Sequence, residues 1–333
     1  MPTERPWTPW HDRLHRFLLA APDLLPKRST LLVAVSGGQD SMAMLGLLQD
    51  LKRLHFWKLL VWHGDHAWHT GSAAIAAQLK EWCDSQQHPI DISRASDWRK
   101  HSENAAREWR YEELQKRAIS YQCDVVMGHT ASDRAETVML QMARGCDLSG
   151  LGSLRPKRPL DRSHPDGPQL RRPMLSFSRT ETREICNELD LPIWLDPSNE
   201  SIAFARNRIR KDVLPVLENL YPGSSRRMAN MAERMSHVQD TQNELADIAL
   251  ETLTEVDGLD RRRLSSLSDA TRQAVIHHWI QTSGVPTTSA VLIAQLSHRL
   301  RFGSAAGTKA LPGDWILQWD NKIVRLRCQS SGL

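Results

Sequence analysis

Residues 34–45 read AVSGGQDSMAML, and this stretch decides the fold class of the N-terminal part of the chain. A continuous apolar run at 31–35 leads into its glycine-rich part, and apolar residues at helical spacing continue after it to Leu54. A short apolar run that ends at glycines is typical of a strand buried on both faces, and the later spacing predicts a helix. The sequence therefore predicts a strand, a glycine-rich turn and a helix, in that order.

The alternation of strand and helix then repeats along the chain. The spacing predicts further strands at 58–63, 90–94 and 124–128, and helices at 73–85, 103–121 and 133–143. Strands and helices that alternate at this pitch are joined by right-handed crossovers into a parallel sheet. We therefore expect an α/β domain with a doubly wound parallel sheet over residues 1–220.

The rest of the chain predicts a smaller, mainly helical domain over residues 221–333. Before it, within residues 1–220, the proline-rich and basic stretch 145–173 predicts a loop or boundary. Helices are predicted at 180–189, 207–219, 226–253, 269–281 and 289–300, and a hairpin at 315–319 with 322–327.

Composition restricts the class of protein. With 333 residues and 40% hydrophobic content, the chain can bury two cores, and its formal net charge of +4 permits an acidic partner such as nucleic acid without requiring one. The five cysteines never form C-x-x-C, which disfavours a disulfide scaffold or a zinc ribbon. Because no apolar run approaches the roughly 18 residues of a membrane span, we expect a cytoplasmic protein without a membrane partner.

The turn at 36–41, Ser-Gly-Gly-Gln-Asp-Ser, has two interpretations. Glycines let the backbone approach a phosphate, and the following helix offers its first N–H groups and its positive dipole end. Ser36 and Ser41 can add hydrogen bonds, and Asp40 can reach a Mg²⁺ ion that bridges phosphates. The alternative is an ordinary turn in which Asp40 or Ser41 caps the helix. Neither the Walker loop nor the G-x-G-x-x-G loop is present here.

The order S-G-G-x-D-S after an apolar strand resembles the PP-loop of the ATP pyrophosphatases, whose fold is adenine nucleotide alpha hydrolase-like. Within that superfamily, four further stretches resemble the tRNA(Ile)-lysidine synthetases. They are LVWHGDHAW (60–68), ENAAREWRYE (103–112), GHTASDRAET (128–137) and WLDPSNESIAFARNRIRKDVLPVL (194–217). An ion-paired helix face or a capping box would explain one stretch alone, but their joint order favours the family.

The resemblance implies a ligase that uses ATP and Mg²⁺. It adenylates the C2 oxygen of the wobble cytidine of the tRNA(Ile) with a CAU anticodon, and the ε-amine of L-lysine then bonds to C2 and displaces AMP. The product, lysidine, switches the tRNA from AUG to AUA, and the resemblance also allows for a homodimer. The ATP-binding residues implied are Ser36, Gly37, Gly38, Gln39, Asp40 and Ser41, with Asp40 as the Mg²⁺ contact.

The same resemblance, together with residue chemistry, suggests the other contacts. The expected catalytic or lysine-binding residues are Asp133, Glu136, Arg107 and Arg110. The expected tRNA and nucleotide face is Arg171, Arg172, Arg206, Asn207, Arg208 and Arg210, since guanidinium groups suit phosphates.

The chain also departs from the family pattern. Ser132 stands where an acid is usual, Arg134 stands beside Asp133 where an amide is usual, and HAWH at 66–69 replaces H-G-L-R. Three alternatives remain open: a tRNA thiolase with the same loop, a small-molecule amidating enzyme, and an inactive RNA-binding module. The lack of C-x-x-C disfavours the first, the arginine-rich segment at 194–217 the second, and the intact loop the third.

Overall fold

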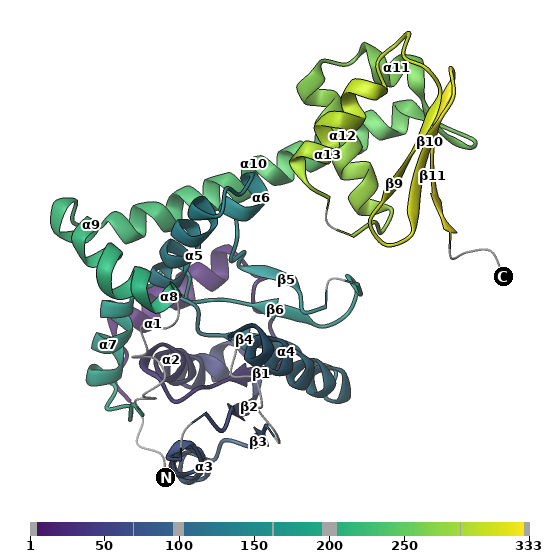
Figure 1. Cartoon of the computed structure of the whole chain (residues 1–333). Helices are drawn as coiled ribbons and strands as arrows, with labels where there is room; N and C mark the ends of the chain where they lie inside the picture. Colours follow the sequence, from purple (N-terminus) through teal and green to yellow (C-terminus); the bar gives the residue numbers. More distant parts are fainter. Residues whose placement is uncertain are drawn as a thin grey trace. The chain divides into compact units, whose positions relative to one another are not determined.

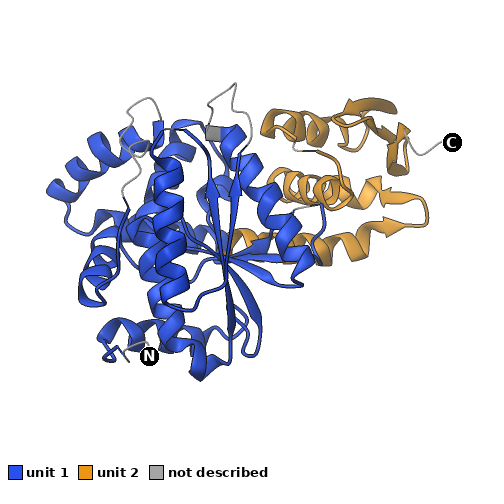
Figure 2. Ribbon diagram, turned by 90° about the horizontal axis from the view of Figure 1, so that it is seen from below, with its two compact units in different colours: residues 1–236 blue, residues 237–333 orange. Residues whose placement is uncertain are grey.

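The computed structural model describes residues 5–68, 70–95, 103–161, 163–194, 205–286 and 288–329 (Figure 1). The chain divides into two compact units, residues 1–236 and 237–333 (Figure 2). The boundary predicted from the sequence lies at 220. The difference arises in the long helix α10 (Ser224–Leu253), whose first residues belong to the first unit and whose remainder belongs to the second.

The first unit is the predicted doubly wound α/β domain. Its strands are β1 (Thr30–Ala34), β2 (Lys58–Asp65), β3 (Ile90–Arg94), β4 (Asp124–Met127), β5 (Lys157–Pro159) and β6 (Gln169–Arg171). Its helices up to the last predicted crossover are α1 (Pro9–Ala20), α2 (Gln39–His55), α3 (Ser72–Ser85), α4 (Glu103–Ser120) and α5 (Ala131–Ala143). The strand order is β3-β2-β1-β4-β6-β5, and all neighbours are parallel except β5 and β6.

Strand β1 lies at the centre of this sheet, which explains its continuous apolar run. Leu31 and Val33 pack into the core that includes Leu45 and Leu48 of α2. Leu32 points to the opposite face, into a separate core. Because successive side chains of a strand alternate between faces, a strand covered on both sides must be apolar at every position.

The proline-rich stretch after α5 contains more structure than predicted. It holds the short helix α6 (Leu148–Leu151) and the strands β5 and β6, and β6 joins the sheet beside β4. The prediction of a loop over all of 145–173 was therefore wrong. Each of these strands has three residues, rich in Lys, Arg, Gln and Pro, so neither shows the apolar alternation by which a strand is recognised.

The predicted helix at 207–219 is present but irregular. It consists of α8 (Ala205–Arg208), a π-helical turn (Ile209–Val213) and α9 (Leu214–Leu220). Pro215 has no N–H group, so it cannot donate the α-helical hydrogen bond to the carbonyl of Lys211. Before this segment, α7 (Arg179–Glu188) begins with a capping box between Ser178 and Glu181.

The second unit combines helices with a larger sheet than expected. Its five antiparallel strands have the order β7-β8-β11-β10-β9. The strands are β7 (Thr254–Glu255), β8 (Gly258–Asp260), β9 (Gly307–Leu311), β10 (Trp315–Trp319) and β11 (Ile323–Cys328), and the helices are α11 (Arg261–Ser266), α12 (Asp269–Thr282) and α13 (Ala290–Arg299). The predicted hairpin is β10 with β11. No helix within the described residues is both long enough and apolar enough to cross a bilayer.

Candidate active site

A cavity of about 380 Å³ opens at the carboxyl ends of β1, β2 and β4. Its lining includes Ser36 after β1, Asp65 at the end of β2, and His129 after β4. In doubly wound sheets the crossovers change direction at the central strand, here between β1 and β4, and ligands bind outside the strand ends at this point. The topology therefore places the cavity where this architecture offers a binding site.

The predicted phosphate loop forms one wall of the cavity. Gly37 has φ +85°, a left-handed conformation that favours glycine. Its carbonyl accepts a hydrogen bond from the Trp194 backbone at 2.9 Å. At Gly128, after β4, an added Cβ would lie 2.9 Å from the Asp40 carbonyl oxygen, so this glycine lets α2 start close to the end of β4. Gly37 thus allows the turn of the loop, and Gly128 allows the loop backbone to lie close to the end of β4.

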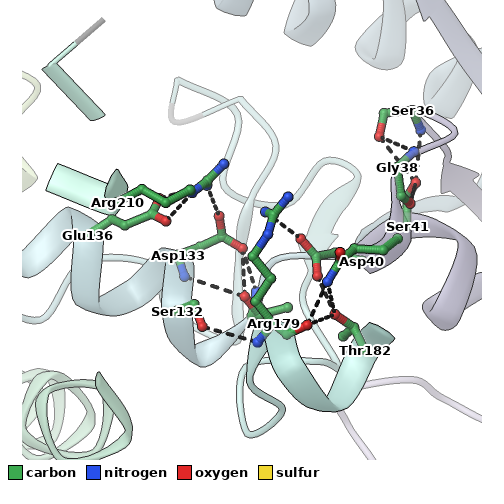
Figure 3. Close-up of polar contacts among 12 residues, drawn as sticks. Ser36, Gly38, Asp40, Ser41, Ser132, Asp133, Glu136, Arg179, Thr182 and Arg210 are labelled. Atoms are coloured by element: carbon green, nitrogen blue, oxygen red, sulfur yellow. Dashed lines mark hydrogen bonds and ion pairs between the residues drawn. The ribbon is translucent and has the colours of Figure 1, made fainter. Parts of the chain in front are cut away.

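The serines of the loop bind one another, and α2 starts without a side-chain cap. The Ser36 backbone donates to Ser41 Oγ at 3.2 Å, and Ser41 Oγ donates to the Gly38 carbonyl at 2.8 Å (Figure 3). Gly38 is the N-cap residue, and no side-chain cap bond forms there. The alternative that Asp40 or Ser41 caps the helix is therefore wrong. The first turn of α2 faces the cavity with its positive dipole end.

The Asp40 side chain turns toward α7. Its Oδ1 accepts a hydrogen bond from Thr182 Oγ1 at 2.5 Å, and its Oδ2 accepts one from Arg179 at 3.2 Å (Figure 3). Burial and the charge of Asp133 raise the pKa of Asp40 to about 6, although Arg179 opposes this shift. Neither Thr182 nor Arg179 was predicted as a site residue. The Ser178–Glu181 capping pattern marks the start of α7, but nothing local indicates that this helix meets a carboxylate 139 residues away.

The Gln39 side chain is also occupied by α7. Its Nε2 donates to the Arg179 carbonyl at 2.5 Å and to Thr182 Oγ1 at 3.1 Å. The residue is 4% exposed. Gln39 was expected among the ATP-binding residues, and its side-chain amide is engaged with α7 instead.

Opposite the loop, four charged residues form what we call the ion cluster: Asp133 and Glu136 of α5, Arg206 of α8 and Arg210 of the π-helical turn. Arg206 donates to Asp133 at 2.9 Å and to Glu136 at 2.7 Å. Arg210 donates to both carboxylate oxygens of Glu136, at 2.5 and 2.9 Å. Burial raises the pKa of Asp133, but the charges of Arg206 and Arg210, together with His129 and the Thr130 backbone hydrogen bond, outweigh it and lower the pKa to about 2. The cluster unites two stretches that the sequence analysis assigned to lysine and to RNA.

Asp133 has a second structural duty. Its Oδ2 accepts from the Thr130 backbone at 2.8 Å and from Thr130 Oγ1 at 2.9 Å, which completes the capping box of α5. A capping box was the alternative explanation for the pair Asp133 and Glu136, but the box of α5 joins Thr130 to Asp133 and does not include Glu136. Asp133 and both arginines of the ion cluster line the cavity, whereas Glu136 is 1% exposed and does not. Only one of the two acids can therefore touch a ligand directly.

The wall next to β2 is aromatic and basic. Arg110 donates to His66 at 3.0 Å, and the Arg107 guanidinium lies 5.0 Å from the Tyr111 ring centre. All four residues line the cavity. Among the described lining residues there are five arginines and three aspartates, so the positive balance favours a polyphosphate ligand.

The residues expected on the tRNA and nucleotide face separate into three groups. Arg206, Asn207 and Arg210 line the cavity. The Arg208 side chain is 68% exposed and pairs loosely with Asp212 at 3.5 Å, so it faces solvent. Arg171 and Arg172 are buried, which sets them apart from any surface.

The two buried arginines hold the sheet and its loops together. Arg171 Nε donates to Asp124 at 2.6 Å, and another of its nitrogens donates to the Leu24 carbonyl at 2.7 Å. Arg172 donates to His129 at 3.2 Å and to the Arg155 carbonyl at 2.7 Å, and burial lowers its pKa to about 10. These contacts explain both residues structurally, and neither lines the cavity.

The two departures in α5 have different consequences. Ser132 Oγ accepts a hydrogen bond from the Arg179 backbone at 3.1 Å, so it ties α5 to the start of α7 (Figure 3). Arg134 was expected beside the acids, but it is 2% exposed and donates toward the Ala229 carbonyl of α10 at 3.4 Å. Successive helical residues point about 100° apart, which explains why Arg134 leaves the ion cluster.

The described residues offer no ready-made metal cage. Nowhere in the described ranges do three His, Cys, Asp or Glu side chains gather as metal ligands. Mg²⁺ is usually held by one or two carboxylates together with substrate phosphates. Asp40, within the phosphate loop, fits that requirement.

Family models match both units of the chain. A PP-loop domain model matches residues 10–217, and a TilS substrate binding domain model matches residues 259–325. Among solved structures, the U34-tRNA thiolase NcsA from Methanococcus maripaludis, with its [4Fe-4S] cluster, is similar with a TM-score of 0.57. It is 20% identical, and the match covers 68% of this chain and 78% of that one, so this likeness concerns the fold alone.

Curated relatives match over nearly the whole chain. The tRNA(Ile)-lysidine synthase of Parasynechococcus marenigrum (strain WH8102) is 56% identical over 326 residues, which is 98% of this chain and 97% of the relative. A tRNA(Ile)-lysidine synthase of Prochlorococcus marinus is 42% identical over 331 residues, 97% of each. With the phosphate loop and the ion cluster facing one cavity, these matches show that the chain belongs to the tRNA(Ile)-lysidine synthase family of PP-loop enzymes.

Proposed function

We propose that the chain attaches L-lysine to C2 of the wobble cytidine in the tRNA(Ile) that has a CAU anticodon. In the first step the C2 oxygen attacks the α-phosphorus of ATP, and the bond to the bridging oxygen breaks with departure of diphosphate. In the second step the lysine ε-amine bonds to C2, the C2–O bond breaks, and AMP leaves while the amine loses a proton. The observation that carries the proposal is the single cavity bounded by both the phosphate loop and the ion cluster.

The loop side suits the triphosphate. The N-terminal turn of α2, together with Ser36 and Ser41, offers N–H and hydroxyl groups to phosphate oxygens. Arg179 adds a guanidinium group whose side chain is 40% exposed at this wall. These groups hold the α-phosphorus in place for attack and stabilise the charge on the departing diphosphate.

Asp40 is the residue proposed to hold Mg²⁺ against the phosphates. The ion would neutralise phosphate charge and favour the departure of diphosphate. Asp40 contributes one carboxylate, and its Oδ2 is shared with a partly exposed arginine rather than with a second acid. This arrangement leaves the remaining positions around the ion to phosphate oxygens and water.

The ion cluster is proposed as the lysine side. Free lysine has two ammonium groups and a carboxylate, so its site needs an acid and a base of the protein. Asp133 is the acid of the ion cluster that reaches the cavity, and Arg206 and Arg210 are available to the lysine carboxylate. Glu136 lies behind them and fixes both arginines. Arg107 and Arg110 are assigned to the activated base or its phosphate.

Arg208 and the second unit are assigned to the tRNA. The exposed Arg208 guanidinium is suited to a backbone phosphate, whereas Arg171 and Arg172 are left out because they are buried. The proposal further includes a cytoplasmic location, where the tRNA substrate resides, and a homodimer, which sedimentation equilibrium would measure.

A thiolase mechanism is disfavoured by the cysteines. None of the described residues that line the cavity is a cysteine. Burial raises the thiol pKa of Cys83 and of Cys186 to about 12 and that of Cys123 to about 11, so these thiols are poor nucleophiles.

The test is incorporation of labelled lysine into tRNA(Ile) with a CAU anticodon, in the presence of ATP and Mg²⁺. The matched control is the same transcript with uridine in place of the wobble cytidine. Incorporation into the cytidine transcript alone supports the proposal. AMP release without label in either transcript would retain the PP-loop chemistry and exclude lysine transfer.

A further inference from the structure

Thr182 touches the loop aspartate although it lies outside the cavity lining. The residue is 0% exposed, on the first turns of α7, and its hydroxyl lies 2.5 Å from Asp40 Oδ1. The same hydroxyl lies 3.0 Å from the Arg179 carbonyl and 3.1 Å from Gln39 Nε2. It therefore sits at the meeting point of three polar groups.

The single proton of that hydroxyl decides which contacts are made. A threonine hydroxyl donates once, and both the Asp40 carboxylate and the Arg179 carbonyl are acceptors. The contact with the carboxylate is shorter and charge-assisted, so the proton goes to Asp40. Gln39 Nε2 is a donor only, and it occupies the acceptor side of the hydroxyl. A directed relay runs from Gln39 through Thr182 to Asp40.

This relay gives the two oxygens of Asp40 different surroundings. Oδ1 is held by a hydroxyl that is fully buried. Oδ2 is bonded to Arg179, whose side chain is 40% exposed and lines the cavity. One oxygen is thus fixed by the protein interior, and the other is accessible for exchange with a ligand.

We infer that Thr182 and Gln39 are positioning residues, which fix the Asp40 carboxylate so that Oδ2 can take Mg²⁺ on the ATP phosphates. The inference rests on the proposed metal role of Asp40 and adds two residues to it. It also gives a role to the variable position of S-G-G-x-D-S. In this chain that position carries a glutamine whose amide nitrogen donates to the Arg179 carbonyl and to Thr182 Oγ1.

The test measures metal dependence rather than turnover. Binding of α,β-methylene-ATP to the full chain is followed by calorimetry at increasing Mg²⁺ concentrations, and the Mg²⁺ concentration for half-saturation is determined for each variant. Thr182→Val keeps the side-chain shape but removes the donor, and it should raise this concentration roughly tenfold, as expected for a hydrogen bond to a charged group. Thr182→Ser should restore it to within about twofold, because the hydroxyl is retained.

Two further variants separate positioning from a general loss of structure. Thr137→Val is the matched control, because the Thr137 hydroxyl of α5 donates only to the Asp133 backbone carbonyl, and its Mg²⁺ dependence should equal that of the parent. Gln39→Leu removes the start of the relay and should raise the half-saturating Mg²⁺ about twofold to threefold. Gln39→Leu decides the question if Thr182→Val fails to fold.

The outcomes are distinct. A lower melting temperature with unchanged Mg²⁺ dependence in Thr182→Val would overturn the inference and leave Thr182 a structural role. In the same titration, Asp40→Asn should raise the Mg²⁺ concentration for half-saturation more than any other variant does. If Asp40→Asn leaves it unchanged, the metal role of Asp40 and this inference both fall, whereas lysine incorporation by the parent chain still decides the reaction.

Discussion

Two helix starts face the same cavity, and the sequence builds them in opposite ways. Both α2 and α5 follow a central parallel strand and carry an aspartate in the first turn. At α2 the cap is Gly38 without a side-chain bond, and the pKa of Asp40 is raised to about 6. At α5 the cap is closed by Thr130, and the pKa of Asp133 is lowered to about 2. The same turn architecture thus yields an open phosphate site and an ion-paired acid site.

The largest expected effect tests the open site. Asp40→Asn should reduce AMP formation by about 100-fold or more, since it removes the charge that is proposed to hold Mg²⁺ on the reacting phosphates. Affinity for tRNA should remain nearly the same. The measurement is AMP release under saturating lysine and tRNA. Unaltered AMP production would remove Asp40 from the metal role and erase the contrast with Asp133.

The second prediction tests the ion-paired acid site at the start of α5. Asp133→Ala should raise the KM for lysine by about tenfold or more, and the KM for ATP much less, because a charge-assisted hydrogen bond to the ammonium group is lost. Asp260→Ala is the control, since Asp260 caps α11 in the second unit and should leave both KM values unchanged. Equal increases for lysine and ATP in Asp133→Ala would show that the residue serves α5 rather than the ligand.

A smaller effect is expected for Arg208, which lies between Arg206 and Arg210 in the sequence but faces solvent. Arg208→Ala should weaken tRNA binding severalfold and reduce the slope of log affinity against log salt by about 1, since one phosphate contact is lost. Binding is measured by filter retention from low to physiological salt. A parent-like slope would take Arg208 off the RNA face and confine the arginine-rich segment to the cavity.

The smallest expected effect concerns the stability of the fold, and it does not involve either site. Burial, followed by repulsion from Lys52 and Arg5, lowers the pKa of His88 to about 4 from its usual 6.5. The unfolded chain therefore takes up this proton first, and stability is lost as the pH falls from 6.5 to 4. The lowered pKa of Asp133 has the opposite sense, since its contribution is present above 3.8 and is lost only as the pH falls toward 2.

His88→Leu should accordingly flatten the loss of unfolding free energy between pH 6.5 and 4, and urea unfolding at several pH values measures it. Asp133→Asn provides the comparison, because its difference from the parent should stay constant over that interval. Identical pH slopes for His88→Leu and the parent would contradict the assignment.

The local parts of this contrast could be predicted from the sequence. The apolar run of β1, the glycines at 37 and 38 and the spacing in α2 are contiguous signals, and they identified the loop. The partners of Asp40 could not be found this way, because Thr182 meets it across 142 residues. The burial of Arg171 could not be predicted from its local sequence either. Its sequence context is basic and proline-rich, but its position in β6 beside β4 buries it.

The ion cluster was predicted as two separate sets of residues. Asp133 and Arg206 lie 73 residues apart, and each has an ordinary local explanation: a helix cap for one and a solvated helix for the other. Pairing between them depends on how α5 and α8 pack, which periodicity does not encode. The two stretches were predicted to be functional because of their joint order after the phosphate loop, which resembles the lysidine synthetase family, and not because of their residue types alone.

The contact between Gln39 and α7 affects whether the phosphate loop can be moved between enzymes by itself. Its six residues are contiguous, but the carboxylate of Asp40 depends on a helix far along the chain. A graft of another enzyme's hexapeptide into this scaffold would bring a new residue at position 39 and lose the relay unless α7 were exchanged with it. An engineered exchange of this loop should therefore include both the hexapeptide and helix α7.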